Sequence, residues 1–273
     1  MSELKIASWN INSVRLRIAL VEKFLKSAKP DVLCLQETKS PNDLFPAKAL
    51  AKLGYKHLAI HGQKGHHGVA IASRLPIEEE SRTVFADKDD CRHVAIRIRP
   101  EGAEPIEIHN FYVPSGGDVP DANANTKFAH KLAFLKAMRD FSAQLANGKG
   151  KARRLLMGDL NVAPLENDVW SHKQMLDVVS HTPIEIAHLA DVIAAHDWRD
   201  LTRIQNPEPE KIYTWWSYRA RDWQASDRGR RLDHIWATPA LASSFRGVEI
   251  LRAARGWRQP SDHVPLTASF EMP

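Results

Sequence analysis

The sequence predicts an α/β fold in which strands and helices alternate within one domain covering residues 1–273. Short runs rich in Val and Ile are bounded by turn residues, as buried strands are. Amphipathic segments with a helical period lie between these runs. No linker, low-complexity tract or change of composition divides the chain. These three observations favour one compact domain of sheets covered by helices.

The individual elements follow from the same patterns. Helices are predicted at residues 18–29, 46–53, 126–145 and 184–197. The first is amphipathic and is stopped by Pro30, since proline breaks a helix interior. The longest carries an apolar stripe at helical spacing, formed by Phe128, Leu132, Leu135, Met138 and Phe141. Strands are predicted in LKIASWN, DVLCLQE, GVAIAS, HVAIRIR, IEIHNFYV, RRLLMGD, IYTWWSY, RLDHIWAT, VEILRAA and VPLTASF.

Composition bounds the class of protein. Hydrophobic residues make up 43% and charged residues 26% of the chain, which suits a globular protein with a substantial core. The formal net charge of +5 is compatible with a polyanionic partner, but ordinary solubility charge explains it equally well. The only cysteines are Cys34, within an apolar run, and Cys91. Their spacing predicts neither a disulfide framework nor a zinc site. Without an apolar signal segment or an apolar run of about 18 residues, we expect a reduced, cytoplasmic compartment and no membrane contact.

Polar side chains stand where several predicted strands end. In RLLMGDLNVAP, residues 154–164, a core strand ends in Asp159 and Asn161, two positions apart. In extended backbone, such residues point the same way. Other strand ends place similar groups at Asn10, Asn12, Glu37, Tyr112, Asp233, Asp262 and His263.

Each of these residues has an ordinary explanation as a turn residue, a cap or a paired core group. Asp233 could pair with Arg230 or Arg231, and a single His263 could be a hydrogen-bonded core histidine. Together they form a set of oxygen donors with one imidazole. Such a set favours Mg²⁺, with Mn²⁺ as a substitute, and does not favour zinc.

The stretches SWNIN, LQETK, GQKGHHGVAIAS, NFYVPSGG, GDLNVAP, YTWWSYR, GRRLDHIW and SDHVPL occur in this order between residues 8 and 266. In this ordered set the chain resembles the exonuclease III family of AP endonucleases, within the endonuclease/exonuclease/phosphatase superfamily. The resemblance implies a four-layer α/β sandwich with two central mixed sheets flanked by helices.

The resemblance also implies roles for the strand-end residues. Glu37 looks like the main Mg²⁺ ligand, and Asp262 would assist the metal or the His263 region. Asn10 and Asn12 are further candidate residues of the metal site, Asn12 because it stands where some relatives have an acidic ligand. Asn10 and Asn161 would also hold phosphate oxygens or the Asp159 side chain. Catalytic roles are implied for Asp159 as the group that activates water, for Asp233 as the partner of His263, and for Tyr112 as a donor toward phosphate.

Aromatic and basic residues interleave in YTWWSYRARDW, residues 213–223. Core packing beside a solvated loop is one interpretation, and a duplex-binding loop with a pocket for an extruded abasic sugar is the other. By resemblance, Trp216 and Leu232 look like pocket walls with Trp215 nearby, and Arg230 stands where some relatives carry an aromatic residue. DNA contacts are also expected from Arg15, Lys64, Lys127 and Arg219.

Several other polar residues favour ordinary roles. His66 and His67 are predicted to form a polar loop rather than a metal site, since adjacent histidines rarely chelate one ion. Arg92 and His93 are predicted to be surface charge.

The favoured function is a bacterial-type, Mg²⁺-dependent DNA repair nuclease. It would incise double-stranded DNA 5′ to abasic sites and trim blocked 3′ ends, with some 3′→5′ exonuclease action. The alternatives are a 3′→5′ exonuclease without strong abasic preference, a less specific Mg²⁺-dependent nuclease, a phosphatase acting on lipids or small phosphates, and a binding module without catalysis. We expect a monomer that works in the cytoplasm on nucleoid DNA.

Overall fold

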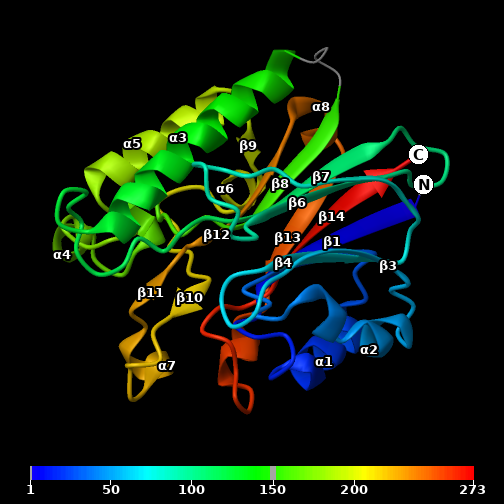
Figure 1. The fold of residues 1–273 in the computed structure, drawn as a ribbon, viewed down its shortest axis with the longest axis horizontal. Coiled ribbons are helices and arrows are strands. Elements are labelled where there is room, and N and C mark those ends of the chain that lie inside the picture. Colours follow the sequence, from blue (N-terminus) through cyan, green and yellow to red (C-terminus); the bar gives the residue numbers. More distant parts are fainter. Residues whose placement is uncertain (1, 148–151) are drawn as a thin grey trace.

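Two six-stranded sheets packed face to face form the centre of the computed structural model, which describes residues 2–147 and 152–273 (Figure 1). The first sheet has the order β13 (Phe245–Ile250), β14 (Leu266–Met272), β1 (Ser2–Asn10), β2 (Val32–Gln36), β4 (Val69–Ser73) and β3 (His57–His61). The second has the order β5 (Ile77–Ser81), β6 (His93–Ile98), β7 (Ile106–Tyr112), β8 (Arg153–Asp159), β12 (Asp233–Ala237) and β9 (Arg199–Asp200). Each sheet mixes parallel and antiparallel pairs.

Helices cover the outer face of each sheet. The helices α1 (Ile18–Ala28) and α2 (Ala47–Ala51) lie outside the first sheet, and α3 (Thr126–Asn147) and α5 (Pro183–Ala194) lie outside the second (Figure 1). A central apolar core fills the space between the sheets, with a further core under each helical layer. The predicted four-layer α/β sandwich is therefore confirmed.

Shorter elements complete the described chain. They are α4 (His172–Met175), α6 (Leu201–Gln205), α7 (Trp223–Ser226), α8 (Pro239–Ala242), the small hairpin of β10 (Trp215–Trp216) and β11 (Gly229–Arg230), and 3₁₀ turns at Asn42–Leu44, Glu166–Asp168 and Arg252–Gly256. The hairpin and α7 project from one end of the sandwich (Figure 1). None of the helices in the described segments is long and apolar enough to span a bilayer.

The elements differ from the predictions mainly at edges and ends. The patterns missed β3 and β5, which are edge strands; in β5 no residue is fully buried, so no apolar alternation marks it. Of IYTWWSY, only Trp215–Trp216 forms a strand. The helix predicted at 184–197 begins at Pro183, where Thr182 and Glu185 form a capping box, and ends at Ala194.

The pairing register sets the position of the site. On the second sheet, Asp159 at the end of β8 pairs with Tyr112 of parallel β7 and with Asp233 of antiparallel β12. On the first sheet, β1 ends at Asn10 beside the end of β2, one residue before Glu37. Polar residues from both sheets therefore meet at one end of the sandwich.

Candidate active site

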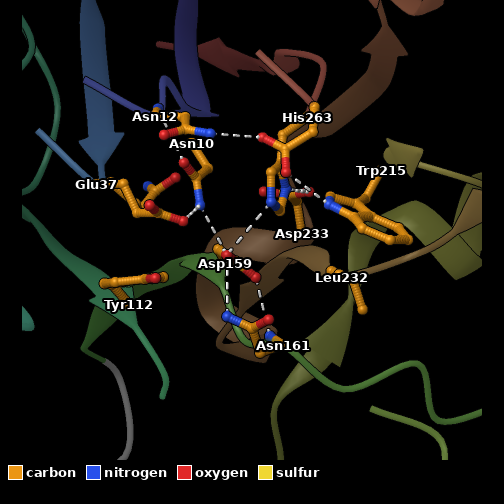
Figure 2. Close-up of polar contacts among 12 residues, drawn as sticks. Asn10, Asn12, Glu37, Tyr112, Asp159, Asn161, Trp215, Leu232, Asp233 and His263 are labelled. Carbon is orange, nitrogen blue, oxygen red and sulfur yellow. Dashed lines mark hydrogen bonds and ion pairs between the residues drawn. The ribbon is translucent and has the colours of Figure 1, made fainter. Parts of the chain in front are cut away.

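Asp159 lies at the centre of the polar cluster (Figure 2). Its Oδ2 atom accepts hydrogen bonds from Asn10 Nδ2 at 2.8 Å and from Asn161 Nδ2 at 3.1 Å. Its Oδ1 atom accepts from the Asn161 backbone N–H at 3.0 Å. Asn161 reaches back because its backbone is left-handed, with φ of 52°. The predicted convergence of Asp159 and Asn161 is thus achieved through a turn rather than through continued extended backbone.

The loop that carries Asn161 is held from beneath by a buried ion pair. Lys131 of α3 pairs with Glu185 of α5, and both side chains are fully buried. Lys131 Nζ also donates to the Asn161 carbonyl at 2.7 Å. The two outer helices therefore fix the backbone on which Asn161 stands.

His263 lies between two carboxylates. Its Nδ1 atom is 2.8 Å from Asp233 Oδ2, and its Nε2 atom is 3.6 Å from Asp159 Oδ2. Burial alone would lower the His263 pKa, but the charges of Asp233 and Asp159 raise it to about 10. Thr214 donates to the same Asp233 oxygen at 2.6 Å and so fixes the Asp233 carboxylate. His263 is therefore a protonated donor at neutral pH.

The pKa of the buried Asp159 carboxyl lies close to neutral pH. Burial raises the Asp159 pKa to about 7; the His263 charge opposes this rise, and the charges of Asp233 and Glu37 add to it. A carboxylate with such a pKa can accept a proton from water near neutral pH.

Glu37 and Asp262 form the other side of the cluster, with amides between the acids. Asn10 Nδ2 also donates to Glu37 Oε1 at 2.9 Å, and Asn12 Nδ2 donates to Asp262 Oδ1 at 3.1 Å. Lys39, which no sequence pattern marks as a site residue, lies 2.8 Å from Glu37 Oε2 and donates to Asn12 Oδ1 at 2.6 Å. The donor nitrogens of both asparagines face carboxylates, so we interpret the two amides as positioning groups rather than metal ligands.

Negative charge exceeds positive charge in this cluster. The carboxylates are Glu37, Asp159, Asp233 and Asp262, and the cations are Lys39 and His263. Buried negative charge of this kind is stabilised by a bound cation. The ligand atoms of Glu37, Asp159 and His263 lie within 4.8 Å of one another. Of these three, His263 is hydrogen-bonded to Asp233, and the carboxylate oxygens of Glu37 and Asp159 are the hard ligands that suit a metal ion such as Mg²⁺.

Tyr112 completes the site from β7. Burial, reinforced by the charges of Glu37 and Asp159, raises the Tyr112 pKa well above its ordinary value, so the phenol stays protonated. The Arg92 guanidinium lies 4.8 Å from the Tyr112 ring centre and donates to the Tyr112 carbonyl at 3.2 Å. The prediction that Arg92 and His93 are surface charge is wrong: both are buried, and Arg92 braces Tyr112.

The two tryptophans of the β10 strand face opposite ways. Trp215 Nε1 donates to Asp262 Oδ2 at 3.0 Å, so this ring lies at the edge of the cluster (Figure 2). Trp216 is only 1% exposed and packs in the core against Tyr213 and Trp223. The structure therefore contradicts the prediction that Trp216 is a pocket wall, because neighbouring strand residues point to opposite faces.

Arg230 occupies the space beside Trp215 and Leu232. Its guanidinium lies 5.0 Å from the Trp215 ring centre and donates to the Val179 carbonyl at 3.1 Å and to Ser180 Oγ at 2.9 Å. Leu232 is 4% exposed and packs in a small apolar cluster with Trp215 at its margin. Arg230 is thus fixed in place rather than free in solvent.

The remaining basic residues predicted to contact DNA are exposed. They are Arg15, Lys64, Lys127 and Arg219. Arg17, two residues after Arg15, instead donates a hydrogen bond from Nη2 to the Tyr218 hydroxyl at 3.0 Å. A residue that contacts DNA phosphate must be exposed, so the position of these four residues is compatible with that role. Their assignment as DNA contacts stays a prediction.

A family model described as "Endonuclease/Exonuclease/phosphatase family" matches residues 7–263, a range that contains the whole polar cluster. The chain belongs to this family.

Individual relatives agree with this membership. Exodeoxyribonuclease III from Haemophilus influenzae is 31% identical, and the match covers 98% of this chain and all of the relative. The structure of an AP endonuclease from Archaeoglobus fulgidus superposes with a TM-score of 0.89 at 33% identity, covering 98% of this chain and 100% of that chain. The structure of a 3′ phosphatase from Neisseria bound to a product DNA hairpin gives a TM-score of 0.88 at 30% identity, again covering 98% of this chain and 100% of that chain. The predicted resemblance is confirmed.

Proposed function

We propose that this protein is a Mg²⁺-dependent DNA repair nuclease of one domain that hydrolyses phosphodiester bonds in double-stranded DNA. The observation that carries this proposal is the position of Asp159, held between Asn10, Asn161 and the protonated His263 with Glu37 within ligand distance. The cluster joins a base, a cationic donor and metal-binding oxygens at one point. A base activates the attacking water, and a cationic donor and a metal ion stabilise the charge that develops in phosphodiester hydrolysis.

Each residue of the cluster has its own role in the proposed reaction. Asp159 accepts the proton of the attacking water, because its pKa lies near neutrality. The imidazolium of His263 neutralises charge on the phosphoryl oxygens, and the protonated phenol of Tyr112 donates toward phosphate or the leaving oxygen. A Mg²⁺ ion held by Glu37, or Mn²⁺ in its place, would supply Lewis-acid stabilisation when bound.

The proposed substrate is DNA with an abasic site or a blocked 3′ end, acted on by a cytoplasmic monomer. The relatives named exodeoxyribonuclease III, AP endonuclease and 3′ phosphatase support this substrate range. Exposed basic residues would hold the phosphate backbone, and such contacts make binding weaken as salt concentration rises.

A second candidate is a 3′→5′ exonuclease without strong abasic preference. Arg230 favours this alternative, because its guanidinium lies over the Trp215 ring and is hydrogen-bonded to the Val179 carbonyl and the Ser180 hydroxyl. An extruded sugar would need to displace that charged group. Burial lowers the Arg230 pKa to about 10, which still leaves the group charged at neutral pH.

One assay distinguishes the two candidates. A single preparation is tested with Mg²⁺, with and without EDTA, on a labelled duplex with one abasic-site analogue and on an undamaged duplex with a recessed 3′ end. Fast, EDTA-sensitive incision at the abasic site supports the repair endonuclease. A ladder of 3′ degradation without abasic incision supports the exonuclease, and the absence of cleavage of either duplex would refute the nuclease assignment.

A further inference from the structure

A second group of metal-ligating side chains lies apart from the candidate active site. Within residues 2–147 and 152–273, two groups of three His, Cys, Asp or Glu side chains bring their ligand atoms together. One is the Glu37, Asp159 and His263 group described above. The other consists of His61, Asp89 and Cys91, whose ligand atoms all lie within 4.8 Å of one another.

We propose that His61, Asp89 and Cys91 bind one zinc-class divalent ion. The three residues supply one nitrogen, one oxygen and one sulfur ligand, and solvent supplies the fourth position of a tetrahedral site. This site was not expected from the sequence, because His61 and Cys91 are thirty positions apart rather than in a short ligand spacing.

The separation of the first two ligands already fits one ion. His61 Nε2 and Asp89 Oδ1 are 3.3 Å apart. In a tetrahedral zinc site with bonds of about 2.0–2.2 Å, the edge between a nitrogen and an oxygen ligand is ~3.4 Å. An imidazolium–carboxylate ion pair has a similar separation, so the thiol of Cys91 is the group that distinguishes an ion site from a simple pair.

The other nitrogen of the His61 ring supports ligation. His61 Nδ1 lies 3.0 Å from the backbone carbonyl of His93. As a carbonyl oxygen can only accept, Nδ1 carries the proton in this contact. With Nδ1 used in this contact, Nε2 is the ring nitrogen left to ligate an ion, and it lies on the Asp89 side of the ring. Metal-binding histidines are oriented by this kind of bond to a carbonyl or carboxylate.

Ligand chemistry and access both favour zinc over magnesium at this place. A thiolate and an imidazole are soft or borderline ligands, whereas Mg²⁺ prefers oxygen. The Asp89 side chain is 69% exposed, which leaves a path from solvent, while the Cys91 residue is only 8% exposed. The two metal sites would therefore differ in the ion that they select.

The location gives the ion a structural role. His61 ends β3, at the edge of the first sheet, and Asp89 and Cys91 precede β6 of the second sheet. A bound ion would tie the two sheets together next to Arg92, which braces Tyr112. Occupancy would stabilise the fold, because a ligand that binds the native state raises its stability.

Cobalt provides a direct test, because it occupies zinc sites and its thiolate complexes absorb in the near ultraviolet. Reduced protein is stripped of metal, supplied with excess Mg²⁺ to saturate the oxygen-rich site, and titrated with Co²⁺. We expect one equivalent to produce a thiolate-to-cobalt band that Zn²⁺ abolishes by displacement. We also expect Zn²⁺ to raise the melting temperature. Absence of the band would overturn the proposal.

Matched variants assign the site. Cys91→Ser should lose the band, and Cys34→Ser, which alters the fully buried second cysteine, should keep it. Since Asp89 is exposed, Asp89→Asn should fold and should weaken Zn²⁺ affinity by at least ~10-fold in competition with a chromophoric chelator. His66→Gln, in the neighbouring exposed loop, should leave affinity unchanged.

Three results would contradict the assignment. Retention of the band in Cys91→Ser would show that this thiol is not a ligand. Loss of Co²⁺ binding in Glu37→Gln would show that the ion occupies the active-site cluster instead. Unchanged Zn²⁺ affinity in Asp89→Asn would reduce the group to a hydrogen-bonded pair and would also overturn the proposal.

Discussion

Replacing Asp233 with Asn tests whether a carboxylate keeps His263 protonated. The substitution retains the shape of the side chain and removes the charge 2.8 Å from His263 Nδ1. Two unit charges ~4 Å apart attract by about 4 kcal/mol at an effective dielectric constant of about 20, which equals ~3 pKa units. Burial opposes the rise of the His263 pKa from 6.5 to about 10, so the charge of Asp233, together with that of Asp159, has to overcome this opposing effect as well.

The sign of the effect follows from this raised pKa. His263 contributes stability that is fully present below pH 6.5 and is lost as pH rises through about 10. Activity that needs the imidazolium should fall over the same alkaline range. In Asp233→Asn, the alkaline limb of kcat/KM should move toward neutrality by ~3 units, because that is the size of the lost attraction while the attraction of Asp159 is unchanged.

The assay is a pH profile of kcat/KM on a labelled duplex at saturating metal, together with ¹⁵N NMR of the His263 ring. A matched control is Asp200→Asn, which alters a carboxylate bound to Arg231 on the same sheet without a contact to His263. The control should keep the wild-type profile. An alkaline limb that does not move in Asp233→Asn would refute the charge argument.

Three further substitutions test separate parts of the molecule. Asp159→Asn should lower turnover by ~10²–10⁴-fold with little change in DNA affinity; equal losses of both would argue against a role as base. Glu37→Gln should lower the rate of metal-dependent cleavage by ~10²-fold or more, while circular dichroism shows an intact fold. Near-wild-type activity would contradict the assignment of Glu37 as a metal ligand. Arg231→Met should lower the free energy of unfolding by about 3–5 kcal/mol in a urea titration, because Asp168 and Asp200 lose their shared partner; a loss below ~1 kcal/mol would contradict this account.

Local sequence patterns identified most elements and most polar residues of the cluster, because strand ends are visible as apolar runs that stop at Asn10, Glu37 and Asp159. They did not identify the contacts between elements. Lys39 is adjacent to a recognised motif, yet its partners Glu37 and Asn12 are known only once two loops are brought together.

Register explains the errors that remained. Trp215 and Trp216 are neighbours with the same side chain, and a shift of one residue decides which of them faces Asp262 and which enters the core. Arg92 and His93 head a strand with charged groups, which resembles a surface pattern. Only the packing of β6 beside β7 shows that both are buried.

The pairing of β1 with β14 has a consequence for synthesis of the protein. β1 carries Asn10 and lies between β2 and β14, while Asp262 and His263 immediately precede β14. In a nascent chain, the side of β1 that faces β14 therefore stays unpaired until residues 266–272 have left the ribosome. His263, which supplies the imidazolium, is synthesised equally late. An incomplete chain would therefore be unable to cut nucleic acid while it is still being made.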